Sequence, residues 1–180
     1  DLALCEGLMY LHHPQFSFIE NTVAQPSFGR VLSVKSQFGL PHLEQPGFRF
    51  SSELGGGALL DVASYPVSAA RRLLGAHLDL VKSHVFQPSG FEVDTHGFAL
   101  MSSPSGAYSF LEWGYNRAYK NEISVWGENA SLHSDFIFSK PPDYEPRVSV
   151  RDQHGKVRYT DIEPTNSFCS MFSTFARAVY

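Results

Sequence analysis

Two side chains able to hold or move a proton, Asp61 and Tyr65, stand four positions apart in the stretch SSELGGGALLDVASYPVSAARRLLG at 51–75. Residues at this spacing share one face of a helix. A carboxylate and a phenol beside a glycine turn could together bind or protonate a polar substrate in a cleft. Ser64, Ser68 and Arg72 continue the same polar stripe. The simpler explanation is therefore the solvated face of an amphipathic helix, and spacing alone favours it.

Histidines and cysteines give weaker indications of chemistry. His12 and His13 precede Pro14, where a helix is expected to begin. Adjacent histidines on an extended segment point to opposite faces, so no metal site is predicted. His13 could cap the helix or pack in a loop, and either histidine could form a hydrogen bond with a substrate. Cys5 and Cys169 have no CxxC neighbour, which disfavours a zinc site or a disulfide framework and favours a reducing cytoplasm.

The length and composition are those of one globular domain. The chain has 180 residues, of which 43% are hydrophobic and 18% charged, and its formal net charge is -4. Because no basic run occurs, a nucleic-acid partner is not expected. No long apolar run and no positively charged leader are present, so membrane and secretory classes are not expected. The start without Met and the end inside an amphipathic run suggest that both ends were cut from a longer chain.

The pattern along the chain favours an α+β fold. We expect an extended piece around 6–11, a helix over 14–25, a strand closed by Gly39, a loop over 41–53 and one helix from the glycine turn to Leu74. Strand patterns follow at 78–87, 95–115 (a hairpin), 119–127, 130–138, 147–152 and 156–162, and a last helix at 166–180. Two or three helices and about seven mostly consecutive strands predict an open, predominantly antiparallel β-sheet with helices packed on one face. GGGALL follows a loop and gives no nucleotide-binding GxGxxG signal.

Two long motifs resemble the C-terminal domain of the glucose-fructose oxidoreductase, inositol dehydrogenase and MocA (GFO/IDH/MocA) family. They are EGLMYLHHPQFSFIENTVAQPSFGRVLSVKSQF at 6–38 and ELGGGALLDVASYPVSAARRLLG at 53–75. They stand in the family's order and at a similar separation, and a strand-rich stretch follows. The later segments NEISVWGENASLHSDFIFSKPPDYEP and FARAV look most like the members that reduce a keto group on a nucleotide-linked sugar.

The resemblance implies a fold and a division of labour. It implies a glyceraldehyde-3-phosphate dehydrogenase-like C-terminal domain over 1–180, which binds substrate and forms oligomers. An N-terminal Rossmann domain, absent from the chain, would bind most of an NAD or NADP cofactor, so the fragment alone is expected to be inactive. The implied partners are a small-molecule sugar substrate and a second copy of the chain, paired through the sheet face.

The resemblance also implies site residues. The family joins a Lys of an upstream EKP motif to an Asp and a His or Tyr that map onto Asp61 and Tyr65, the candidate catalytic pair. Tyr10, His12 and His13 are then candidates for the substrate wall. Where the family often has Arg before the histidines this chain has Leu11, which puts one polar substrate contact in doubt. A non-catalytic binding or assembly module and a dehydrogenase of free sugars or polyols remain alternatives.

Overall fold

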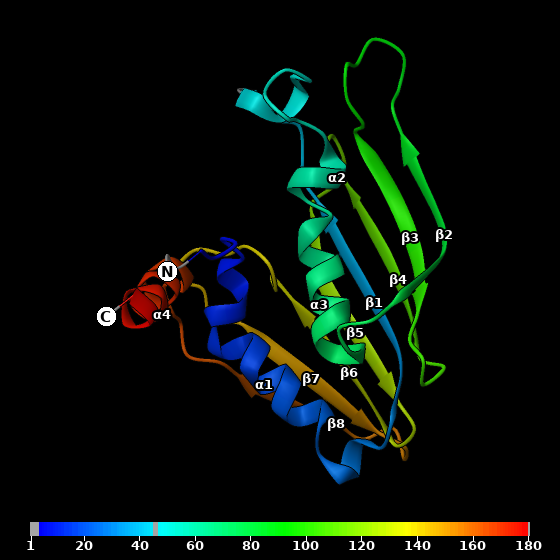
Figure 1. Cartoon of the computed structure of the whole chain (residues 1–180). Helices are drawn as coiled ribbons and strands as arrows, with labels where there is room; N and C mark the ends of the chain where they lie inside the picture. Colours follow the sequence, from blue (N-terminus) through cyan, green and yellow to red (C-terminus); the bar gives the residue numbers. More distant parts are fainter. Residues whose placement is uncertain (1–3, 45–46, 180) are drawn as a thin grey trace.

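The protein forms one open sheet of eight strands among the residues that its computed structural model describes, 4–44 and 47–179. The order across the sheet is β2-β3-β4-β1-β5-β6-β7-β8 (Figure 1). The strands are β1 (Val31–Gly39), β2 (Asp79–Phe86), β3 (His96–Ser102), β4 (Tyr108–Gly114), β5 (Lys120–Gly127), β6 (Ala130–Asp135), β7 (Arg147–Asp152) and β8 (Val157–Asp161). Neighbours pair antiparallel except for the parallel pair β1 and β4, so the predicted open, mainly antiparallel sheet is confirmed.

Helices cover one face of the sheet and leave the other open (Figure 1). The α-helices are α1 (Pro14–Val23), α2 (Ala58–Asp61), α3 (Ser64–Leu74) and α4 (Ser167–Val179), and the 3-10 turns are η1 (Met9–His12), η2 (Pro26–Phe28) and η3 (Gly47–Phe50). α3 packs on β1 and β4, while α4 lies against η1. Within the described residues no helix is long and apolar enough to cross a membrane.

Strand alternation explains which face is covered. In β1, Val34, Ser36 and Phe38 are buried and point towards the helices, while Lys35 between them is exposed on the other face. Successive side chains of a strand point to opposite faces, so inner strands such as β4 and β5 contribute alternate residues to one core, whereas the edge strand β2 is exposed along its whole length. That core includes Phe16 from α1 and Leu111 from β4, both without exposed surface.

The single helix expected after the glycine turn is wrong: it is broken into α2 and α3. Pro66 has no N–H to donate to the carbonyl of Val62, and its ring clashes with a regular helix at that carbonyl. The backbone adapts locally, because the N–H of Ala63 donates five positions back to Ala58 O at 3.0 Å. Asp61 therefore ends one helix and Tyr65 lies in the next.

Two other expectations need correction. The piece around 6–11 is not extended throughout, because Met9–His12 form the 3-10 turn η1. The expected loop over 41–53 contains the turn η3 at Gly47–Phe50, and residues 45–46 of that loop lie outside the described residues. The helix that begins at Pro14 is confirmed and ends at Val23.

Candidate functional site

Asp61 and Tyr65 line one small pocket although they lie on different helices. Its volume is about 260 Å³. The lining residues come from the segment before η1, from η3, from the glycine turn and from the α2–α3 break: Glu6, Gly7, Leu8, Phe48, Gly55, Leu60, Asp61, Ser64 and Tyr65. The helix break thus brings a carboxylate, a hydroxyl and a phenol to one hollow.

The Asp61 carboxylate is held on one oxygen by two donors. Arg49 Nε donates to Oδ2 at 2.9 Å, and the hydroxyl of Tyr115 donates to the same oxygen at 2.8 Å. Tyr115 is buried at the end of β4, whereas the Arg49 and Asp61 side chains are 31% and 22% exposed. Hydrogen bonds between charged partners are the stronger kind, so the two donors fix the orientation of the Asp61 side chain.

Tyr65 lies between the pocket and the core. Its hydroxyl donates to Met9 Sδ at 3.5 Å, and its ring packs against Phe38 and Phe138 with centroids 5.3 and 5.8 Å away. Burial, followed by the negative charge of Asp61, raises the pKa of Tyr65, while Arg49 acts in the opposite direction. The phenol therefore carries its proton at neutral pH and can donate a hydrogen bond, while transfer of that proton needs a nearby cation that lowers the pKa again.

Tyr10 is part of the core beneath this pocket. It has no exposed surface, its hydroxyl pairs with the Ser68 hydroxyl, and burial raises its pKa. Its ring contacts Phe16 and Phe138 edge-on. Tyr10 also packs against the pocket residue Tyr65, with ring centroids 6.0 Å apart, and its contact with substrate stays a prediction.

His13 caps helix α1 and is also buried. The N–H of Gln15 donates to its Nδ1 at 3.0 Å, and its Nε2 is buried with no hydrogen-bond partner among the described residues. Burial, then the charge of Lys140, lowers the pKa of His13 to about 4. Neither His13 nor the partly exposed His12 lines the pocket, so their role in a substrate wall also stays a prediction.

The glycine turn fixes the start of α2 against Asp94. Gly57 has φ of +117°, and a Cβ there would lie 2.5 Å from Asp94 Oδ1. Asp94 in turn accepts from the N–H of Leu59 at 2.8 Å through its other oxygen and caps the helix. A side chain at position 57 would therefore disturb the cap that holds α2.

Sequence reasoning missed Arg49 and Tyr115. Arg49 stands in the expected loop over 41–53, to which no role was assigned, and Tyr115 is the last residue of the predicted hairpin at 95–115. No spacing rule connects them with Asp61, because they are 12 and 54 positions away. Only the folded chain brings them together.

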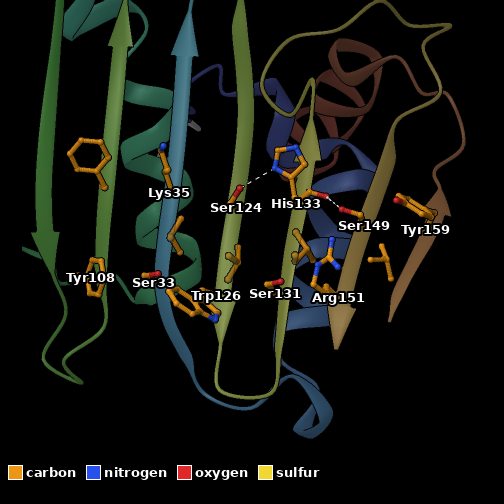
Figure 2. A pocket seen from close by; sticks show the side chains of 15 residues that line it. Ser33, Lys35, Tyr108, Ser124, Trp126, Ser131, His133, Ser149, Arg151 and Tyr159 are labelled. Carbon is orange, nitrogen blue, oxygen red and sulfur yellow. Dashed lines mark hydrogen bonds between the residues drawn. The ribbon is translucent and has the colours of Figure 1, made fainter. Parts of the chain in front are cut away.

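A second, wider depression of about 770 Å³ lies on the open sheet face (Figure 2). Trp126, Tyr108 and Tyr159 stand on this face and are 62%, 47% and 65% exposed. Serines, Lys35 and Arg151 stand among them.

Near this depression Glu122, His133 and Asp135 gather within metal-binding distance of one another. Their donor atoms are already engaged: His133 pairs with Ser124 and Asp135, and Glu122 accepts from Lys120 at 2.7 Å. The cluster is therefore an internal polar network of the sheet face.

Comparison with known proteins identifies the family. The family model described as the GFO/IDH/MocA C-terminal domain matches residues 16–133. The chain belongs to this family. The match includes residues 16–38 of the first motif, the whole motif at 53–75 and most of the sheet, so the resemblance to the family is confirmed.

The curated relatives that this chain resembles include oxidoreductases that act on sugars. The chain is 30% identical over 178 residues to a dTDP-3,4-didehydro-2,6-dideoxy-alpha-D-glucose 3-reductase of Actinomadura kijaniata, covering 99% of this chain and 53% of the relative. It is 29% identical over 180 residues to D-xylose 1-dehydrogenase (NADP(+)) 2 of Haloferax volcanii, covering 99% and 54%. The chain thus spans about half the length of the curated relatives it matches.

Solved structures agree with the fold. A 3-ketoreductase of Actinomadura kijaniata in complex with NADP and TDP-benzene superposes with a TM-score of 0.93 at 30% identity, over 99% of this chain and 55% of that one. An aldose-aldose oxidoreductase of Caulobacter crescentus has a TM-score of 0.84 at 20% identity, over 96% and 52%, which shows the fold alone.

Proposed function

We propose that this chain is the substrate-binding half of an NAD(P)-dependent oxidoreductase that acts on the carbonyl or hydroxyl of a nucleotide-linked sugar. Support comes from the 3-reductase of Actinomadura kijaniata, which matches along 99% of this chain. The related ketoreductase structure holds NADP and TDP-benzene. In the proposal the cofactor is bound mainly by a partner domain of the same polypeptide, and these residues form the opposite wall of the site.

The observation that carries the proposal is the shared pocket of Asp61 and Tyr65. The bound nicotinamide would supply or accept the hydride, which leaves the protein to handle the proton on the substrate oxygen. Tyr65 holds a proton at neutral pH and faces this pocket, so it would hydrogen-bond or protonate that oxygen. Asp61 would orient the reacting group. A lysine outside 1–180, as in the family's EKP motif, would complete the proton path.

Exposed apolar side chains around this pocket fit a covering domain. Leu54 and Leu60 are each 68% exposed, and Leu60 lines the pocket itself. A neighbouring hollow shares Gly7 with the first and is lined by Leu4 and the α4 residues Met171, Phe172 and Phe175. Exposed apolar side chains gathered next to a polar site are typical of an interface. A cofactor-binding domain packed on them would exclude water from the reaction.

We further propose that the open sheet face pairs with a second copy of the chain. Strand register places an acidic row across it, with Glu112, Glu122 and Asp135. The next rows carry Lys35 and Arg151 around the exposed aromatic rings. Rows of opposite charge on one face are self-complementary about a two-fold axis.

A cytoplasmic location is part of the same proposal. Cys5 and Cys169 are both free and exposed. Unpaired thiols are typical of a reducing compartment, whereas disulfides accumulate in oxidising ones.

A dehydrogenase of free sugars is the second candidate, because the Haloferax volcanii relative is named a D-xylose 1-dehydrogenase. The test is a substrate screen with the complete polypeptide and NADPH or NADP⁺, comparing nucleotide-linked keto sugars with free aldoses and polyols. We expect turnover with the nucleotide-linked class. Turnover with free sugars only would favour the second candidate, and none with either class would favour a binding or assembly module.

The matched variants are Tyr65→Phe and Tyr159→Phe, each of which loses one hydroxyl. Loss of a general acid costs roughly 10²- to 10⁴-fold in rate. We expect Tyr65→Phe to lose at least the lower part of that range and Tyr159→Phe, on the open face, to keep wild-type kcat. Undiminished turnover by Tyr65→Phe would remove this residue from the chemistry.

A further inference from the structure

Nothing in the sequence motifs assigns a role to the two donors on Asp61, but their geometry is specific. Both bind the same oxygen, Oδ2, at 2.9 and 2.8 Å. Among the described residues the other carboxylate oxygen receives no hydrogen bond, and Asp61 lines the pocket that also contains Ser64 and Tyr65. The carboxylate is therefore anchored on one side and available on the other.

We propose that Arg49 and Tyr115 are positioning residues that keep Asp61 an oriented hydrogen-bond acceptor, so that Tyr65 is the residue of this chain that gives the proton. The inference rests on the proposed function. It assigns separate roles, hydrogen-bond acceptor and proton donor, to two residues that the family motif names only as a pair. Asp61 accepts a hydrogen bond from the substrate or from the lysine of the partner domain, and Tyr65 donates.

The Tyr115 hydroxyl is built to be a permanent donor. Its side chain is buried, its ring packs against Phe50 with centroids 5.3 Å apart, and its hydroxyl lies 2.8 Å from Asp61 Oδ2 and 3.2 Å from Gly57 O. Burial, and then the bond to Asp61, raises its pKa. Its hydroxyl proton is committed to Asp61 Oδ2 at 2.8 Å, so Tyr115 does not compete as a proton source. The charged acceptor is the closer one, and it takes the single proton of this hydroxyl.

Arg49 is placed by the glycine turn. Its carbonyl accepts from the N–H of Gly57 at 2.9 Å, and its guanidinium lies 5.1 Å from the centre of the Phe48 ring. A Cβ at Gly56 would approach Arg49 O to 2.6 Å, so only glycine permits this close packing of η3 on the start of α2. The same turn that begins the helix thus brings the cation to Asp61.

The arrangement has an electrostatic consequence for Tyr65. A lone carboxylate beside a phenol makes loss of the phenol proton harder, and both Asp61 and Glu6 act this way on Tyr65. Arg49 neutralises part of that charge and acts in the opposite direction. Removing Arg49 would therefore have two effects: the Asp61 carboxylate would lose its fixed orientation, and Tyr65 would become a weaker proton donor.

The test uses the complete polypeptide with NADPH and a nucleotide-linked keto sugar. Misplacing a reacting group by about 1 Å can cost roughly 10²-fold. We expect Arg49→Met to lower kcat by about 10- to 100-fold with KM changed less than about 3-fold, and Arg49→Lys to recover part of the loss. Tyr115→Phe should lose less, because the charged donor, Arg49, still holds Asp61. The control is Arg30→Met, which removes an exposed arginine paired with Glu128 and should keep wild-type kcat.

Two readouts separate positioning from a general loss of structure. In an Asp61→Asn background Arg49→Met should change kcat by less than about 2-fold, because residues that act through one group are not additive. In the crystal structure of Arg49→Met, the Asp61 carboxylate should leave its wild-type orientation while the Tyr65 ring keeps its place. Wild-type kcat in Arg49→Met, or an unmoved Asp61 carboxylate, would overturn the proposal.

These outcomes also separate the inference from the function on which it rests. Failure of the wild-type protein to reduce any nucleotide-linked sugar contradicts the proposed function. In that case the crystal structure alone decides whether Arg49 orients Asp61. An active wild type with an equally active Arg49→Met contradicts only the inference.

Discussion

The three glycines at 55–57 should respond to alanine in three different ways. Gly55 has φ of +72° and open space around its missing Cβ, Gly56 has no positive φ but a Cβ would lie 2.5 Å from Phe48 O, and Gly57 combines φ of +117° with a contact of 2.5 Å to Asp94 Oδ1. The first change tests backbone strain alone, the second steric overlap alone, and the third tests both.

The magnitudes follow from these contacts. An L-residue in the left-handed region costs about 1–2 kcal/mol, so Gly55→Ala should destabilise by about 1 kcal/mol after the gain from a less flexible unfolded chain. Gly56→Ala presses on backbone, and overpacking costs about 1–3 kcal/mol. It also strains the 2.9 Å hydrogen bond from Gly57 N to Arg49 O, worth about 1 kcal/mol, so we expect a loss of about 3 kcal/mol. Gly57→Ala should lose at least as much, because the Asp94 cap is displaced as well.

Urea unfolding of the complete polypeptide, followed by far-ultraviolet circular dichroism, measures these losses. Gly7→Ala is the matched control, because nothing lies within 4 Å of its missing Cβ and its φ is ordinary. Gly56→Ala should also lower kcat more than Gly55→Ala, because it moves η3 and with it Arg49. Equal destabilisation by Gly55→Ala and Gly56→Ala would refute the close packing on which this reasoning depends.

Two further predictions concern other parts of the molecule. His13 has a pKa of about 4 in the folded protein against about 6.5 unfolded. The folded state therefore binds fewer protons between these values, and stability should fall by about 2–3 kcal/mol as the pH drops from 6.5 to 4. His13→Asn keeps a capping side chain and should flatten this dependence in unfolding curves; an unchanged slope would contradict a buried neutral histidine. Trp126→Asp on the open face should shift the complete polypeptide towards monomer in sedimentation velocity, whereas Phe172→Asp on α4 should not; an unchanged state would contradict pairing through this face.

Local sequence signals determined most of the elements. Pro14 begins a helix because its fixed φ suits a first turn, and it does so here. The hairpin predicted at 95–115 is formed by β3 and β4, and it turns at Pro104 and Gly106, two residue types that turns favour; the N–H of Gly106 donates to Ser103 O at 3.0 Å. Alternation of polar and apolar residues predicted the strands, because successive side chains point to opposite faces. The broken helix at 58–74 was also within reach, since Pro66 is visible in the sequence.

The candidate pair was also present in the sequence, but its surroundings were not. The motif around Asp61 and Tyr65 identified the pair, whereas spacing alone favoured a solvated stripe. Tertiary structure decided otherwise: Tyr65 is half-buried against β1, and Tyr10 and His13, candidates for the substrate wall, lie in the core.

Long-range contacts decided the rest. β1 pairs with β4 across the 68 residues 40–107 that separate them in the chain, and the end of β4 carries Tyr115 to Asp61. Arg49 reaches the same carboxylate only because Gly56 allows η3 to touch the start of α2. Residue types and local periods determine helices, strands and turns, since those depend on neighbours in the chain. Which donors meet a given carboxylate depends on how the sheet is assembled, and no local pattern records that.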